Sequence, residues 1–149
     1  MRYIQEILAN RILGIGILAW FAAQFLKIVF TAIIEKKWDF SRLFFGLGGM
    51  PSSHSSVVCA LATSVGIARG FYSAEFAICT LLAFIVMTDA AGVRRSAGKQ
   101  AALLNKIVQD MVEAGEWPTT DRLKEMLGHT PFQVIIGALL GVLIALLFM

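Results

Sequence analysis

Charged residues are scarce in this chain. They make up 15% of its 149 residues, whereas about a quarter of a soluble domain is charged. The net charge of +3 comes without any block of lysines or arginines, which excludes the usual basic surface of a nucleic-acid-binding protein. With 58% hydrophobic residues in long runs, the composition indicates a protein whose solvent is a lipid bilayer.

Cysteine and histidine are also rare. The two cysteines, Cys59 and Cys79, both lie inside apolar runs, where cysteine usually acts as a small hydrophobic side chain. Neither a disulfide framework nor a zinc-ligand pattern is present, so we expect no metal and no cofactor. Any chemistry that needs an imidazole must use His54 and His129, since the chain has no other histidine.

Four segments are candidates for membrane helices. Ile12–Ile34 and Thr130–Met149 reach the roughly 20 residues that a spanning helix needs. Ser52–Gly70 opens with a polar run and Phe76–Thr88 is short, so either could be re-entrant or buried by its neighbours. A cleaved signal peptide is the alternative for the first segment, although its apolar run continues past any plausible cleavage site. We predict one all-α membrane domain over residues 1–149, a small bundle of about four membrane helices.

One long polar stretch, Asp89–His129, separates the third and fourth segments. Apolar residues recur at helical spacing from Val93 to Met111, which predicts an amphipathic helix at the membrane surface or across the end of the bundle. A second, short helix is predicted over Asp121–Leu127. Thr130, followed by a first-turn proline, is a suitable N-cap for the last segment.

Four crossings would bring this polar stretch to the same side of the membrane as the GGMPSSH motif. That side would hold nine of the 13 lysines and arginines, namely Lys36, Lys37, Arg42, Arg94, Arg95, Lys99, Lys106, Arg122 and Lys124. Arg2, Arg11 and Arg69 would lie on the other side, with both chain termini. The positive-inside rule then predicts a cytoplasmic basic face in the plasma membrane, although an anion-binding site would produce the same bias.

The run GGMPSSHSS, residues 48–56, is either a turn with a well-capped helix start or a binding site built on that turn. His54 falls in the first turn of one predicted helix and His129 directly precedes another, and helix N-termini attract anions. One neutral imidazole can attack phosphorus while one imidazolium protonates the leaving oxygen. The alternative is that both histidines only cap helix ends. Further candidates for phosphate binding are Ser52, Ser53, Ser55, Arg94, Arg95 and Lys99.

GGMPSSHS resembles the second signature of the type 2 phosphatidic acid phosphatase and vanadium haloperoxidase superfamily, which usually reads Pro-Ser-Gly-His. With DAAGVRRSAGKQAALLN and LKEMLGHTPFQV, it resembles the short, divergent membrane branch of that superfamily more closely. The three blocks keep their order and cover roughly Lys27 to Gly137. The resemblance implies that His54 is a general acid and that His129 is a nucleophile.

The chain departs from the superfamily pattern at several positions. Ser53 replaces the motif glycine, and no Lys-x6-Arg-Pro first motif exists, so Lys27 and Arg42 replace it by position only. Gln133 stands where an acid is expected to orient the nucleophilic histidine. An amide can accept a hydrogen bond from imidazole, but it cannot stabilise imidazolium by charge. Asp89 is the alternative source of that charge.

These features predict a lipid phosphatase that hydrolyses a phosphomonoester or pyrophosphate through a phosphohistidine, with phosphatidylglycerophosphate or phosphatidate favoured. Two alternatives remain open: a non-catalytic protein that binds or transports lipid phosphates, and a structural membrane subunit. The GxxxG pattern from Gly137 to Gly141 adds the prediction of a homodimer.

Overall fold

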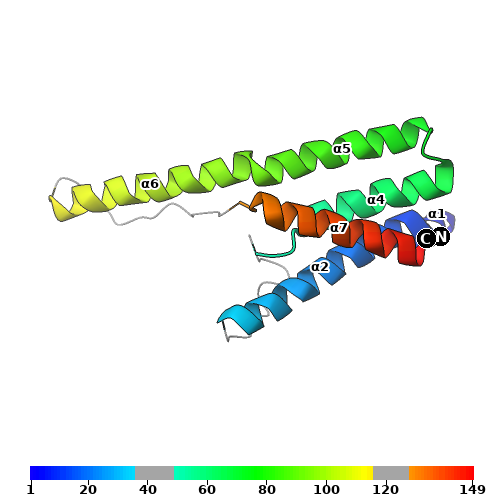
Figure 1. Ribbon diagram of the computed structural model, residues 1–149, viewed down its shortest axis with the longest axis horizontal. Coiled ribbons are helices and arrows are strands. Elements are labelled where there is room, and N and C mark those ends of the chain that lie inside the picture. The colour runs from blue at the N-terminus through cyan, green and yellow to red at the C-terminus, as the bar shows by residue number, and fades with distance from the viewer. Residues whose placement is uncertain (36–48, 116–127) are drawn as a thin grey trace.

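The computed structural model describes residues 1–35, 49–115 and 128–149, and all regular structure in these ranges is helical (Figure 1). The predicted all-α membrane fold is therefore confirmed. The predicted short helix Asp121–Leu127 lies outside the described residues. The helices are α1 (Arg2–Leu8), α2 (Arg11–Glu35), α4 (Ser53–Arg69), α5 (Ala74–Ala91), α6 (Val93–Glu113) and α7 (Pro131–Phe148).

α4 is the central helix of the bundle and packs against α2, α5 and α7. It has 17 residues and buries mostly small ones, namely Ser53, Ser55, Ser56, Ala60, Ala62, Ser64, Val65 and Gly66. In the part of the chain that the structure describes, the stretches long and apolar enough to cross a membrane are Arg11–Ile33, Ala74–Glu113 and Pro131–Phe148, so α4 is not among them. Its polar character is tolerated because protein rather than lipid surrounds much of it.

The contact between α4 and α7 depends on two glycines. A Cβ atom at Gly137 would collide with the carbonyl oxygen of Ser52, and one at Gly141 with that of Ser56. Cα–H groups can therefore approach these oxygens closely, as in other membrane-helix interfaces built from small residues. The hypothesis that Gly137 and Gly141 form a homodimer interface is wrong, because α4 of the same chain occupies this surface. Pairing of two copies through another face stays a prediction.

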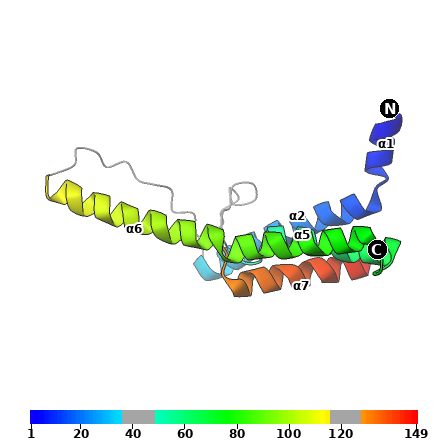
Figure 2. The ribbon, with the colours of Figure 1, turned by 90° about the horizontal axis from the view of Figure 1, so that it is seen from above.

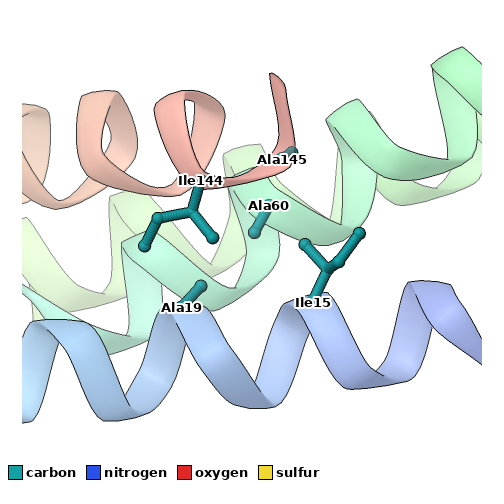
Figure 3. Close-up of a cluster of buried hydrophobic side chains, with 5 residues drawn as sticks. All are labelled: Ile15, Ala19, Ala60, Ile144 and Ala145. Atoms are coloured by element: carbon teal, nitrogen blue, oxygen red, sulfur yellow. The ribbon is translucent and has the colours of Figure 1, made fainter. Parts of the chain in front are cut away.

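α2, α4 and α7 share a small apolar core (Figure 3). It consists of Ile15 and Ala19 of α2, Ala60 of α4, and Ile144 and Ala145 of α7. Three of the five are alanines, so the helix backbones approach closely. The Ser56 hydroxyl adds a hydrogen bond of 3.1 Å to the Ala19 carbonyl, which ties α4 to α2.

α5 and α6 run almost in line, so that α6 projects beyond the bundle (Figure 2). The predicted amphipathic helix is present. Of its two predicted positions, the one across the end of the bundle is wrong, because among the described helices α6 contacts only α5. The position at the membrane surface stays a prediction. The backbone at Gly92 explains the direction. Gly92 N–H donates to Thr88 O at 2.8 Å and Gly92 O accepts from Ser96 N–H at 2.9 Å, so hydrogen bonding continues through the junction.

Both termini lie at the end of the bundle opposite the start of α7 (Figure 1). There the Arg11 guanidinium donates to the Phe148 carbonyl from Nε at 3.2 Å and from Nη2 at 2.8 Å. A cation at the C-terminal end of a helix is also favourable for the helix dipole. α2, α4, α5 and α7 alternate in direction along the bundle (Figure 1).

We expect Gly141→Ala to destabilise the protein, because the new methyl group must push α7 away from the Ser56 carbonyl. Overpacking of this kind costs about 1–3 kcal/mol, so the apparent Tm in detergent should fall by several degrees. Gly14→Ala is the matched control, since a Cβ atom there meets nothing within 4 Å. An equal Tm for the two variants would contradict the close approach of α4 and α7.

Candidate functional site

The N-terminal ends of α4 and α7 lie next to each other. Ser52 is the N-cap of α4 and Thr130 is the N-cap of α7. The Ser52 N–H donates to the Gln133 carbonyl at 3.1 Å, which fixes the two ends at the same level. The positive ends of two helix dipoles therefore lie in one region.

Both histidines are found in this region. His54 is exposed in the first turn of α4, whereas His129 is only 6% exposed and directly precedes the N-cap of α7. Their ring centroids are 6.5 Å apart and the ring planes are inclined by 60°. The structure thus brings together the two imidazoles that the motifs singled out. His54 is accessible from outside, whereas His129 is buried; the contact of both rings with one phosphate stays a prediction.

Gln133 contacts the His129 ring. Its Oε1 lies 3.4 Å from His129 Nδ1, which is a long hydrogen bond, and it accepts from the Thr130 N–H at 3.0 Å. The Thr130 hydroxyl in turn accepts from the Gln133 N–H at 3.3 Å, which completes a capping box. Gln133 therefore occupies the position next to the ring that the spacing of four residues predicts.

Lys27 of α2 lies next to the start of the GGMPSSH motif, and only 2% of the residue is exposed. A Cβ atom at Gly49 would lie 3.2 Å from Lys27 Cγ, and Gly49 has a φ of 85°, so both space and backbone conformation favour glycine here. Gln24 and Thr31 are also buried and follow the spacing of one helix face with Lys27. α2 thus contributes a polar stripe to the site, although the rest of the helix is apolar.

The environment of His129 favours its neutral form. Burial lowers the pKa of the imidazole below its ordinary value of 6.5, and the positive charge of Lys27 lowers it further. Hydrogen bonds to Gln133 and to the Gly49 backbone act in the opposite direction, and His54 adds a smaller lowering effect. At neutral pH the ring therefore has a nitrogen lone pair available.

The serines of the motif are held by helix capping and packing. The Ser52 hydroxyl oxygen accepts from Ser55 N–H at 3.4 Å and from the Ser55 hydroxyl at 3.0 Å. Ser53 is the first residue of α4 and is 5% exposed. These contacts give Ser52 a structural role at the start of α4, and the binding of substrate by Ser52 or Ser53 stays a prediction.

The other predicted site residues are placed as follows. Asp89 is half-buried near the end of α5, a helix that contacts α7. Lys99 is exposed on α6, which projects away from the histidines. Arg94 and Arg95 lie in the first turn of α6, but the structure does not describe their side chains. Arg42 lies outside the described residues. The roles of all five stay predictions.

Sequence reasoning missed two features of the site. The first is Gly49, whose signal was the double glycine before the motif. The second is the buried face of α2, whose signal was the spacing of Gln24, Lys27 and Thr31 at i, i+3 and i+7 in an otherwise apolar run. Among the described residues no group of three His, Cys, Asp or Glu side chains could hold a metal ion.

Comparison with known proteins agrees with the motifs. A family model described as "Divergent PAP2 family" matches residues 8–144. The chain is 41% identical over 151 aligned positions to the "Uncharacterized membrane protein YuiD" of Bacillus subtilis (strain 168), with 95% of each chain covered. No solved structure matches the chain significantly.

We expect Lys27→Met to raise the pKa of His129, because it removes a nearby positive charge while methionine keeps most of the packing volume. Titration of the His129 ring by NMR of protein labelled with ¹⁵N-histidine measures the change. Lys106→Met is the control, since Lys106 is exposed on α6. The same pKa of His129 in the wild type and in Lys27→Met would show that the charge of Lys27 does not reach the ring.

Proposed function

Because this chain belongs to the divergent PAP2 family, we propose that it is a lipid phosphatase that hydrolyses a phosphomonoester or pyrophosphate of a membrane lipid. The observation that carries the proposal is the pair of imidazoles, His54 and His129, with ring centroids 6.5 Å apart at two adjacent helix N-termini. The chain has only two histidines, and their position side by side is best explained if both act on the same group.

In the proposed first step, Nε2 of neutral His129 attacks the phosphorus atom. The bond from phosphorus to the lipid oxygen breaks as the nitrogen–phosphorus bond forms, and His54 donates a proton to the leaving oxygen. In the second step a water molecule gives a proton to His54 and attacks the phosphohistidine. Inorganic phosphate leaves from a monoester, and both histidines return to their starting protonation states.

The phosphate would be held by positive groups in a region of low dielectric, where charge-assisted hydrogen bonds are strong. The buried Lys27 and the positive ends of the α4 and α7 helix dipoles support this assignment most directly. Additional ligands from the same face would be Arg42, Ser52, Ser53, Arg94, Arg95 and Lys99. Asp89 would supply a charge near the end of α5, while Gln133 orients His129.

The substrate's tails would remain in the bilayer while its headgroup enters from the face that carries the histidines. If this basic face is cytoplasmic in the plasma membrane, as the positive-inside rule predicts, the substrate is drawn from the inner leaflet. Phosphatidylglycerophosphate and phosphatidate both carry a terminal phosphate monoester and fit this position. In this scheme the protein's own groups carry out catalysis, and no metal or cofactor is required.

Gln133 favours a second candidate function, the binding or transport of lipid phosphates without turnover. An amide next to His129 cannot stabilise the positive charge that develops on the ring as it attacks. The same cations and helix N-termini would then bind the headgroup and release it unchanged.

Phosphate release by the purified protein separates the two functions. Against a panel of lipid phosphates in detergent, we expect His129→Ala and His54→Ala each to lower turnover by at least about a hundredfold, as loss of a nucleophile or general acid does. Binding of the lipid phosphate should change little. Lys106→Ala, an exposed cation on α6, is the control and should retain full activity. Binding by the wild type without release of phosphate from any lipid would instead establish the binding function.

Thiol labelling tests the proposed orientation. After Cys59 and Cys79 are replaced by alanine, Tyr72→Cys should react with a membrane-impermeant reagent in intact cells. Tyr72 is 96% exposed in the turn between α4 and α5, at the end of the bundle opposite the histidines. Lys106→Cys on α6 should react only after the cells are made permeable. The reverse pattern would place the histidines outside the cell.

A further inference from the structure

Ser56 is the residue of α4 at which three helices of the bundle meet. Its hydroxyl donates to the Ala19 carbonyl of α2 at 3.1 Å. Its own carbonyl oxygen faces α7, where a Cβ atom at Gly141 would collide with it. Ser56 is fully buried, so its hydroxyl joins helices and is not available to a substrate.

Lys27 lies on the same buried face of α2 as Ala19. Ala19, Ala23 and Lys27 follow one another at intervals of four residues, and each is at most 2% exposed. The segment from Ala19 to Lys27 covers about 12 Å of the helix axis. Because a helix is stiff along its axis, sliding of α2 at Ala19 would move Lys27 by a similar distance.

The apolar contacts between α2 and α4 determine the position of α2 along α4 only loosely. The core that the two helices share includes Ala19 and Ala60, whose methyl groups protrude little. At Gly16 a Cβ atom would lie 2.9 Å from Leu61 Cδ2, but the Leu61 side chain can change its rotamer as the helices slide. A hydrogen bond weakens steeply when its geometry changes. The bond from Ser56 to Ala19 therefore restricts sliding more than these apolar contacts do.

We infer that Ser56 is a positioning residue: its hydrogen bond to α2 sets the position of that helix along α4, and thereby the distance of Lys27 from His129. Ser56 also lies two residues after His54, so the bond ties the helix of the exposed imidazole to the helix of the buried lysine. The position of Lys27 does not depend on the proposed function. Only the consequence for catalysis rests on it.

The pKa of the His129 ring reports the position of the Lys27 charge, which lowers it. The other groups that act on this ring are His54 of α4, Gln133 of α7 and the Gly49 backbone. Ser56→Ala removes the hydroxyl and keeps a small side chain. We expect the pKa of His129 to rise in this variant, in the same direction as in Lys27→Met and by a smaller amount. The measurement is a ¹⁵N NMR titration of ¹⁵N-histidine-labelled protein in detergent, with His54→Gln to assign the two rings.

A double-substitution cycle shows whether Ser56 acts through Lys27. Ser56→Ala should raise the pKa of His129 in the wild-type background and have no further effect when it is combined with Lys27→Met. Ser64→Ala is the matched control. Ser64 is also fully buried on α4, and its hydroxyl has no hydrogen-bond partner in the part of the chain that the structure describes. This variant should leave the pKa of His129 unchanged.

Circular dichroism must show that each variant keeps the helical content of the wild type. If Ser56→Ala fails to fold, Ser56→Cys decides, because a thiol is a weaker donor than a hydroxyl and should raise the pKa of His129 by less. An unchanged pKa in the deciding variant would overturn the inference. An equal rise with and without Lys27 would overturn it too, since a general loosening of the site would have that effect.

Where turnover is measurable, Ser56→Ala should raise KM several-fold and change kcat less, because Lys27 is proposed to hold the phosphate. A lower kcat with an unchanged KM would contradict this role of Lys27. Absence of turnover in the wild type would count against the proposed function and leave the pKa result standing.

Discussion

The site depends on how closely α7 can approach α4. Glycines at 137 and 141 allow α7 to lie against the carbonyl oxygens of Ser52 and Ser56, and the Ser52 N–H then meets the Gln133 carbonyl. These contacts set the relative height of the two helices. A shift of one helical turn would move the N-terminal ends apart by about 5.4 Å and would separate the two imidazoles. A packing contact between small residues therefore determines the geometry of the reactive groups.

The site concentrates positive potential in a part of the molecule that lipid and protein shield from water. A buried lysine, two helix N-termini and a buried imidazole all meet here. Lys27 and the positive ends of the helix dipoles favour an anion, while burial and the charge of Lys27 lower the pKa of His129. A neutral imidazole avoids placing a further buried charge beside Lys27.

Much of the helical fold could be predicted from the sequence, because apolar runs and caps are local signals. α2, α5 and α7 occur where the runs predict them, and Thr130 caps α7 as expected. The direction of α6 could not be predicted, because it follows from the backbone at Gly92 rather than from amphipathicity. The helix that packs on Gly137 and Gly141 could not be predicted either, since a GxxxG pattern identifies a close-packing surface but not its partner helix. His54 and His129 were identified through topology and motif, whereas the contact between Lys27 and Gly49 requires the folded loop.

The polar character of α4 also has a consequence for how the protein enters the membrane. With 17 residues and several serines, α4 would partition poorly into lipid by itself. It is made after α2 and before α5, so insertion is favourable only when one of these neighbours shields it, most simply as a hairpin with α5. α7 is synthesised later and brings His129 with it. The two imidazoles therefore meet only after α7 is inserted, and a chain interrupted before α7 would enter the membrane with one imidazole alone.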